Sequence, residues 1–141
     1  SLDDPLLPKV PECEITITSR EALETCEKMT QIIKRQVFLL SLAEVGFAEE
    51  VNAASEGTPL SYFQKKGRIA TRDGEGVSWW LRTPDTYFYS VVYGIGPEGS
   101  LGIGNAYDVN AVRPALCLPG DTAVEKRKGP GGNGYYLAGH Q

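Results

Sequence analysis

The 141-residue chain contains a single histidine, His140, and its three cysteines show no C-x-x-C spacing. Zinc sites rely mainly on histidine and cysteine, and a catalytic serine or cysteine usually needs a base held firmly beside it. His140 stands next to the C-terminus, which is a poor place to hold a base. The carboxylates of Asp73, Glu75, Asp85 and Asp108 have no spacing that groups them. We therefore expect no catalytic residue, metal site or cofactor, and interpret the protein as not being an enzyme.

Long apolar runs and an excess of basic residues are also missing. No run approaches the ~20 apolar residues that span a membrane, so we expect no membrane insertion. The chain has 14 Lys and Arg against 18 Asp and Glu, a net charge of -4, which argues against a nucleic-acid surface. The cysteines, Cys13, Cys26 and Cys117, fit one disulfide with a free thiol as well as three reduced thiols. The chain begins at Ser1 without a Met, so we expect a leader or an upstream domain in the parent protein.

Composition divides the chain into three parts. Residues 1–13 contain three prolines and are interpreted as an extended lead-in or linker. Residues 14–118 form the expected domain, which is long enough to bury a core. Residues 119–141 are a glycine-rich tail. Its Tyr135–Leu137 segment either returns as a last strand beside residues 14–18 or is disordered.

Two helices are expected in the first half of the domain. Residues 14–18 alternate polar and apolar side chains, which predicts a strand. Thr18 and Glu21 then fit a capping box, and the following helix would carry an apolar stripe to Ile33 and end at Lys34 and Arg35. Residues 37–40 predict a short buried strand. Ser41 is the expected cap of a second helix over residues 42–54.

The second half of the domain is expected to be all-β. Strands are predicted over residues 77–83, 89–95 and 101–103, and a closing strand over 112–118. Residues 94–99 match the G-x-G-x-x-G string of dinucleotide sites. That site requires a helix after the glycines, whereas two more glycines follow here. We therefore interpret the string as a hairpin turn.

Four large side chains are expected to serve structure. Trp79 and Trp80 would point to opposite faces of one strand, with one in the core and the other under a helix or along a groove. Arg82 and Arg113 lie within otherwise apolar strands, where a charge needs a partner. We expect each arginine to form an ion pair or to clamp backbone carbonyls.

The segment between these blocks is rich in Tyr, Asn, Asp, Ser and Gly. This mixture is typical of binding surfaces, because tyrosine offers rigid amphipathic area and small polar residues offer adaptable hydrogen bonds. The same mixture is also ordinary for strands and turns, and both interpretations stay open. The candidate ligand-binding residues are Tyr87, Tyr89, Tyr93, Asn105, Tyr107 and Asp108.

Three sequence blocks resemble an uncharacterised family of bacterial and phage domains. They are V-F-L-L-S at residues 37–41, W-W-L-R-T-P at 79–84 and V-R-P-A-L at 112–116. The family is similar in turn to the C-type-lectin-like fold, in the branch of formylglycine-generating enzymes and of the variable proteins of diversity-generating retroelements. This resemblance implies an α+β fold with short antiparallel sheets, two flanking helices and long loops.

The resemblance also implies a function. We expect a non-catalytic module of a bacterial surface protein or phage particle that recognises a protein or a glycan, a diversified variable protein being one form. The first alternative is a structural or assembly domain whose aromatic face packs on a neighbouring subunit. The second is a diverged formylglycine-type oxidase, although that activity needs two late cysteines and only Cys117 is present. The calcium-binding E-P-N, Q-P-D and W-N-D strings of lectins are missing. A cell-surface, secreted or virion location is favoured, within a larger polypeptide or an oligomer.

Overall fold

The computed structural model describes residues 10–47, 51–64, 67–129 and 132–138. The expected lead-in is therefore seen only from Val10, and His140 lies outside the described residues. Within these ranges, every helix is too short to cross a lipid bilayer.

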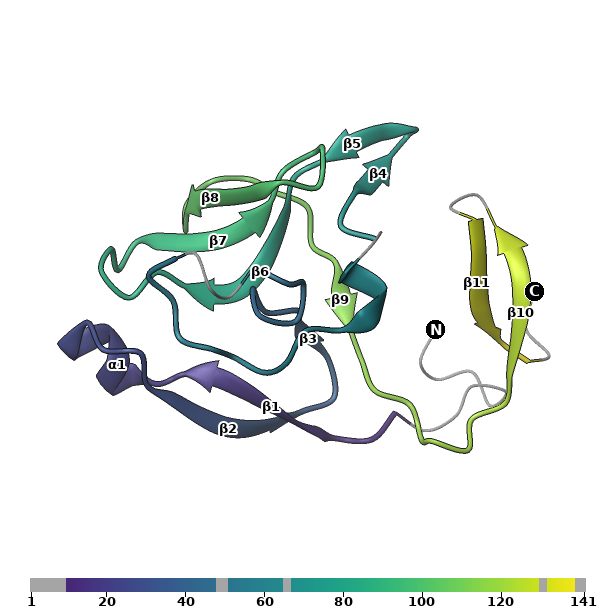
Figure 1. Cartoon of the computed structure of the whole chain (residues 1–141), viewed down its shortest axis with the longest axis horizontal. Coiled ribbons are helices and arrows are strands. Elements are labelled where there is room, and N and C mark those ends of the chain that lie inside the picture. The colour runs from purple at the N-terminus through teal and green to yellow at the C-terminus, as the bar shows by residue number, and fades with distance from the viewer. Residues whose placement is uncertain (1–9, 48–50, 65–66, 130–131, 139–141) are drawn as a thin grey trace.

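The described chain is built mainly from short strands (Figure 1). One three-stranded antiparallel sheet has the order β6-β7-β8, and the remaining strands pair in twos as β1-β2, β3-β9, β4-β5 and β10-β11. The strands are β1 (Cys13–Thr18), β2 (Thr30–Arg35), β3 (Phe38–Leu39), β4 (Ala70–Arg72), β5 (Glu75–Val77), β6 (Trp79–Pro84), β7 (Val91–Ile95), β8 (Leu101–Asn105), β9 (Pro114–Ala115), β10 (Val124–Gly129) and β11 (Gly132–Leu137). The helices are α1 (Arg20–Thr25) and a 3-10 turn, η1 (Ser61–Gln64).

The core forms around β6, whose side chains alternate between buried and half-buried. Trp79, Leu81 and Thr83 are buried, while Trp80 and Arg82 lie on the other face. Because side chains alternate along a strand, one strand supplies both the core and a second surface. The buried cluster around it consists of Leu40, Leu42, Val45, Ala53, Phe63, Trp79, Leu81, Tyr93 and Ile95.

The expected hairpin at the glycine string is confirmed, because β7 and β8 pair antiparallel from Val91 with Asn105 to Ile95 with Leu101. Gly99 has a φ of +80° in the connecting turn, a conformation that side chains with a Cβ rarely adopt. The string is therefore a turn between two strands.

The long first helix predicted up to Arg35 is wrong. α1 is only six residues long, with Ser19 rather than Thr18 as its N-cap, and it ends at Cys26 in a left-handed conformation. The residues that would have continued the helix form β2, which pairs with β1 from Thr18 with Thr30 to Cys13 with Arg35. Ladder pairing with β1, the strand before α1, outweighed the apolar spacing that suggested a helix.

The second predicted helix is also wrong in its described part. Ser41 was expected to cap this helix, and it forms a reciprocal cap with Glu44, with the Ser41 amide donating to the Glu44 carboxylate at 2.9 Å and the Glu44 amide donating to Ser41 Oγ at 3.1 Å. The chain makes a turn there rather than a helix, and Gly46 follows with a φ of +90°. A capping box is therefore present without the helix that usually follows it.

These two differences overturn the expected fold class. The described chain is a set of small antiparallel sheets with one short α-helix, not an α+β C-type-lectin-like fold with two flanking helices. The closing strand is also shorter than residues 112–118, since only Pro114–Ala115 pair with β3. Tyr135–Leu137 pairs with β10 and not with residues 14–18.

Candidate binding surface

Asp85 organises the loop between β6 and β7. Asp85 is 5% exposed, and its Oδ1 accepts hydrogen bonds from the amides of Tyr87 at 2.7 Å and Phe88 at 2.9 Å. The other oxygen, Oδ2, accepts from the Tyr93 hydroxyl at 2.7 Å. Burial and this hydrogen bond raise the pKa of Tyr93 well above its ordinary value. A buried carboxylate thus fixes the backbone of the loop to the core.

The loop held by Asp85 exposes three consecutive aromatic side chains. We refer to Tyr87, Phe88 and Tyr89 as the aromatic tip; Tyr89 is 93% exposed and the other two are well exposed. The backbone of the loop is bound to its surroundings, because the Thr86 amide donates to Asn52 O at 2.9 Å and the Ala106 amide donates to Ser90 O at 2.8 Å. Exposed rings on a fixed backbone form an apolar surface that needs little ordering before it binds.

The segment after β8 lies beside this loop, because the Ala106–Ser90 hydrogen bond joins them. Tyr107 is exposed there, and Val109 is 97% exposed. Asp108 stabilises its own turn, with Oδ2 accepting from the Asn105 amide at 2.8 Å. Aromatic and aliphatic side chains from two loops therefore share one end of the β6-β7-β8 sheet.

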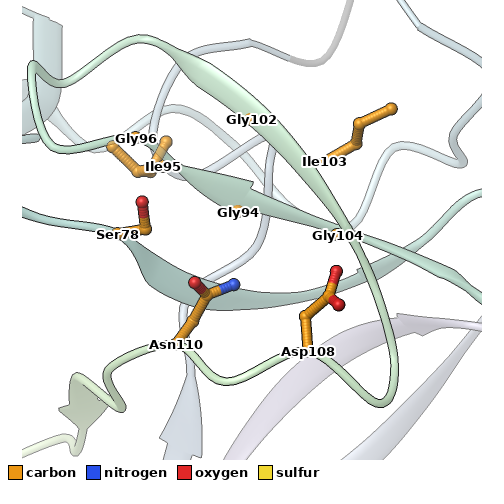
Figure 2. A pocket seen from close by; sticks show the side chains of 9 residues that line it. All are labelled: Ser78, Gly94, Ile95, Gly96, Gly102, Ile103, Gly104, Asp108 and Asn110. Carbon is orange, nitrogen blue, oxygen red and sulfur yellow. The ribbon is translucent and has the colours of Figure 1, made fainter.

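A hollow of about 230 Å³ lies along the face of β7 and β8 (Figure 2), and it extends from Ile95 and Gly96 at the hairpin turn to Asp108 near this end. Ser78, Asp108 and Asn110 face the glycines of β7 and β8 across it. We call this space the glycine hollow. It is lined by Ser78, Gly94, Ile95, Gly96, Gly102, Ile103, Gly104, Asp108 and Asn110.

Glycines open the hollow because they place no side chains over the sheet. Gly94 and Gly102 are cross-strand partners, and Gly104 shares the face of Gly102 because it lies two residues further along the strand. A Cβ on Gly104 would come within 2.8 Å of the Trp80 ring, and one on Gly94 within 2.8 Å of Trp79 O. Gly102 is different, since its Cβ would meet backbone atoms only at 3.5 Å. Two glycines thus allow close packing, and Gly102 leaves free space.

Polar groups converge on the hollow without partners. Within the described part of the chain, the Ser78 hydroxyl and the Asn110 side-chain amide make no hydrogen bond to protein. Together with the free oxygen of Asp108, they offer donors and acceptors to a ligand. A few convergent polar groups in a concave space are typical of sites for small ligands.

The hollow continues into a longer groove. It shares Ser78 and Asn110 with a second hollow of about 360 Å³. This one shares Arg72, Val77 and Ala111 with a third, of about 580 Å³, beside the β4-β5 hairpin. Arg72 and Arg113 line the far end. The groove therefore runs from an acidic side chain, Asp108, to two basic ones.

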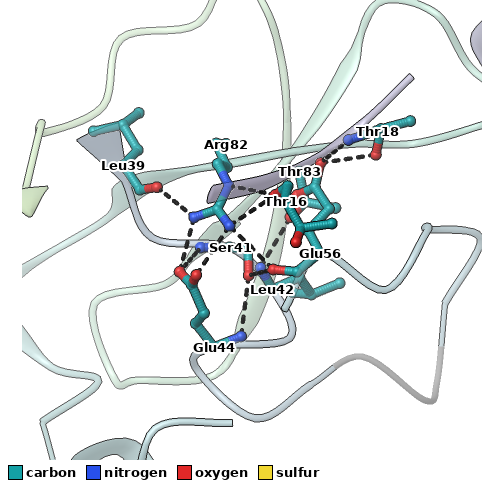
Figure 3. A network of polar contacts seen from close by, with 9 residues as sticks. All are labelled: Thr16, Thr18, Leu39, Ser41, Leu42, Glu44, Glu56, Arg82 and Thr83. Atoms are coloured by element: carbon teal, nitrogen blue, oxygen red, sulfur yellow. Dashed lines mark hydrogen bonds and ion pairs between the residues drawn. The ribbon is translucent and has the colours of Figure 1, made fainter. Parts of the chain in front are cut away.

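The two arginines expected to serve structure have different surroundings. Every nitrogen of the Arg82 guanidinium donates a hydrogen bond (Figure 3). Nη1 and Nη2 bind the two Glu44 oxygens at 2.8 and 2.9 Å, and the same head group reaches the carbonyls of Thr16, Leu39 and Glu56. No nitrogen of Arg82 remains for a ligand. Arg113 donates to Gly67 O and lies 4.8 Å from the centre of the Trp79 ring.

Glu56 completes the polar network of Figure 3 and is 1% exposed. One carboxylate oxygen accepts from the backbone amide and the hydroxyl of Thr18, and the other accepts from the Thr83 hydroxyl. Thr83 Oγ1 in turn accepts from the Leu42 amide at 2.9 Å. A buried carboxylate with several donors is well satisfied. The network therefore joins β1, the Ser41 turn and β6.

The candidate residues proposed from sequence fall into two groups. Tyr87, Tyr89, Tyr107 and Asp108 are exposed at the end of the sheet, and Asn105 is half-buried there. Tyr93 is 3% exposed, within the core, so we leave it out of the binding surface.

Sequence reasoning missed several residues of this surface. Phe88, Ser78 and Asn110 were not among the candidates, and Asp85 was not recognised as the organiser of the loop. The Pro84-Asp85 pair is a turn signal that could have drawn attention to Asp85, because aspartate accepts hydrogen bonds from amides two and three residues later. Glycines spaced by two in β8 could have indicated an uncovered sheet face.

The fold and this surface define a small, nearly all-β domain with a groove and an exposed aromatic loop. The chain belongs to the family described as "Domain of unknown function (DUF6273)", whose family model matches residues 1–120. No curated protein and no solved structure matches the chain.

Proposed function

We propose that this chain is a non-catalytic binding module that recognises its ligand through the aromatic tip and the glycine hollow. The observation that carries the proposal is the anchoring of the aromatic tip by Asp85, which holds three rings in solvent on a fixed backbone. An exposed ring gains free energy when a ligand covers it. A loop used only to connect two strands has no need of three adjacent exposed aromatics.

The chemistry of the surface favours a saccharide as ligand. The glycine hollow, at about 230 Å³, is smaller than the ~300–1,000 Å³ of sites for drug-sized molecules, and its polar lining suits a single hydroxyl-rich ring. Hydroxyl, amide and carboxylate groups can each hydrogen-bond sugar hydroxyls. The aromatic tip and Tyr107 offer flat apolar faces for the rest of the glycan. The groove towards Arg72 and Arg113 gives room for a chain of more than one ring.

The test uses a glycan array with the fluorescently labelled full chain as probe. We expect binding to a subset of glycans, and at least about tenfold weaker binding for the triple variant Tyr87→Ala/Phe88→Ala/Tyr89→Ala, because aromatic side chains are enriched among binding hot spots and a loss of ~1.4 kcal/mol already weakens binding tenfold. The matched control is Tyr135→Ala, which removes an equally exposed ring from the β10-β11 hairpin. Circular dichroism and thermal unfolding confirm that each variant folds.

A second pair of variants tests the glycine hollow. Gly102→Val would fill the space without a backbone clash at its Cβ, while Gly120→Val adds the same side chain where no atom lies within 4 Å. We expect only Gly102→Val to lose glycan binding. If the triple variant and Gly102→Val bind as the unchanged chain does, the assignment of the surface is wrong.

The competing function is an assembly domain, and one observation favours it. Val109 adds exposed aliphatic area to the same end of the sheet and Ile103 adds more at the middle of β8, and contiguous apolar surface is common at subunit interfaces. Size-exclusion chromatography with light scattering separates the two functions. A dimer that the triple variant converts to monomer, together with an inactive glycan array, would favour assembly.

A further inference from the structure

Cys13 and Cys117 lie far apart in the sequence and meet in the fold. Cys13 begins β1, pairs with Arg35 of β2, and donates from Sγ to Arg35 O at 3.4 Å. β3 pairs with β9, with Phe38 opposite Ala115. Cys117 follows Ala115 by two residues and Gln36 precedes Phe38 by two, so Cys117 lies on the Gln36 and Arg35 side of this pairing, just past the end of the ladder. Both cysteines therefore lie beside the backbone of Arg35 and Gln36.

The two thiols lie near each other. A hydrogen bond to the Cys13 thiol, with burial and the nearby charge of Glu44, raises the pKa of Cys117 to about 11. Both side chains are half-buried, so small reagents can reach them. Their proximity is independent of the aromatic tip and of the glycine hollow.

The third cysteine is placed differently. Cys26 follows α1, at the opposite end of β1 from Cys13, and is exposed. Because a strand rises ~3.3 Å per residue, β1 carries the chain roughly 16 Å from Cys13 to Thr18, and Cys26 follows at that far end, after α1. A disulfide needs α-carbons within about 7 Å, which excludes a Cys13–Cys26 bond without rearrangement.

We propose that Cys13 and Cys117 are a modification site, at which a reversible disulfide ties β1 to the segment after β9. The oxidant is a small disulfide such as oxidised glutathione. The thiolate of one cysteine attacks it and releases one glutathione thiol, and the second cysteine then attacks the mixed disulfide and releases the other. One sulfur–sulfur bond forms and one breaks, and the two electrons and two protons pass to glutathione.

The cross-link would close nearly the whole domain into one loop. Residues 14–116 lie between the two cysteines, and long loops lose the most unfolded-state entropy when they are closed. β9 contributes only Pro114–Ala115 to its ladder with β3, so few backbone hydrogen bonds hold the segment that leads to Cys117. The bond would therefore stabilise the domain in an oxidising compartment and open in a reducing one.

The test incubates the full chain in oxidised and then in reduced glutathione, followed by thiol counting and peptide mapping. We expect the oxidised chain to retain one free thiol, on Cys26, and to yield a linked peptide pair that contains Cys13 and Cys117. Its melting temperature should rise by several degrees and return after reduction. Oxidation should quicken as pH rises toward 11, because only the thiolate attacks.

Variants supply the control. Cys26→Ser should keep the cross-link and the melting shift, whereas Cys13→Ser and Cys117→Ser should each abolish both. If a variant fails to fold, peptide mapping of the unchanged chain still shows whether Cys13 and Cys117 form the disulfide. Three free thiols after oxidation, or a bond that includes Cys26, would overturn the proposal.

Discussion

Asp85 has the largest local influence of any single side chain at the candidate surface. Its two oxygens accept three hydrogen bonds, two from loop amides and one from a core hydroxyl. Hydrogen bonds to a charged acceptor are stronger than those between neutral groups. One residue thus couples the stability of the core to the shape of the loop.

Replacing Asp85 by Ala should destabilise the domain by about 2–3 kcal/mol, because the buried Tyr93 hydroxyl loses its partner. Asp85→Asn should cost less, about 1 kcal/mol, since the amide oxygen can still accept from the Tyr87 and Phe88 amides. Urea unfolding measures both values, and hydrogen exchange at the two amides reports the state of the loop. Equal losses of unfolding free energy for Asp85→Ala and Asp85→Asn would show that hydrogen bonds to Asp85 do not hold the loop in place.

Ionisation of Tyr93 makes the free energy of unfolding vary with pH in the alkaline range. The unfolded chain ionises this phenol near its ordinary pKa of 10, while in the folded state burial and Asp85 raise the pKa well above that value. A raised pKa means that the stabilising contribution is complete below pH 10 and is lost as pH rises above it.

We therefore expect the free energy of unfolding to fall above pH 10, by up to about 1.4 kcal/mol per pH unit from this group. Tyr93→Phe has no proton to lose, so its stability should decline less steeply over the same range. Urea unfolding from pH 8 to 11 compares the unchanged chain with Tyr93→Phe. Ionisation of the other tyrosines affects the stability of both proteins equally. Parallel curves for the two proteins would contradict the expected role of Tyr93.

At the scale of elements, the Arg82 side chain links three strands to one another. It extends from β6 and binds carbonyls of β1 and β3 together with the Glu44 carboxylate. The paired side chains are 9% and 14% exposed, so the ion pair is largely withdrawn from water. Removal of one partner from such a pair leaves a charge with poor solvation.

Arg82→Met should destabilise the domain by about 3–5 kcal/mol. The double variant Arg82→Met/Glu44→Gln should recover part of that loss, because the stranded carboxylate is gone, with a coupling of about 1–3 kcal/mol. Chemical denaturation of both single variants and the double variant completes the cycle. Additive losses would mean that the ion pair itself contributes little.

At the scale of the whole molecule, the β10-β11 hairpin stands apart from the other described sheets (Figure 1). Its internal contacts include Arg127 over the Tyr136 ring at 5.5 Å. A two-stranded hairpin alone is at best marginally stable in water. The family match also ends at residue 120, before this hairpin begins.

A chain that ends at Gly120 should therefore fold and melt within about 4 °C of the full chain, since a stability change of ~1 kcal/mol moves the midpoint of a domain of this size by only a few degrees. Differential scanning calorimetry of the two chains tests this. A large drop in melting temperature would show that the hairpin packs on the domain and contributes to its stability.

Some features of this protein were determined by the sequence itself. The β7-β8 hairpin follows from alternating side chains and a glycine turn, and the Ser41–Glu44 cap from a serine three residues before a glutamate. The alternation in β6 likewise places Trp79 and Trp80 on opposite faces. These features depend on a few neighbouring residues, so short-range rules suffice to predict them.

Other features were decided only by tertiary structure. Ile33 continues the helical spacing of Ala22, Cys26 and Met29, yet residues 30–35 form β2 because β1 offers six ladder partners. Tyr89 and Tyr93 lie four residues apart, and only the position where the loop ends and β7 begins leaves the first in solvent and buries the second. The proximity of Cys13 and Cys117 depends on two separate strand pairings. Such outcomes depend on which distant segments meet, because backbone hydrogen bonds and burial between them outweigh the weak preferences of a single segment.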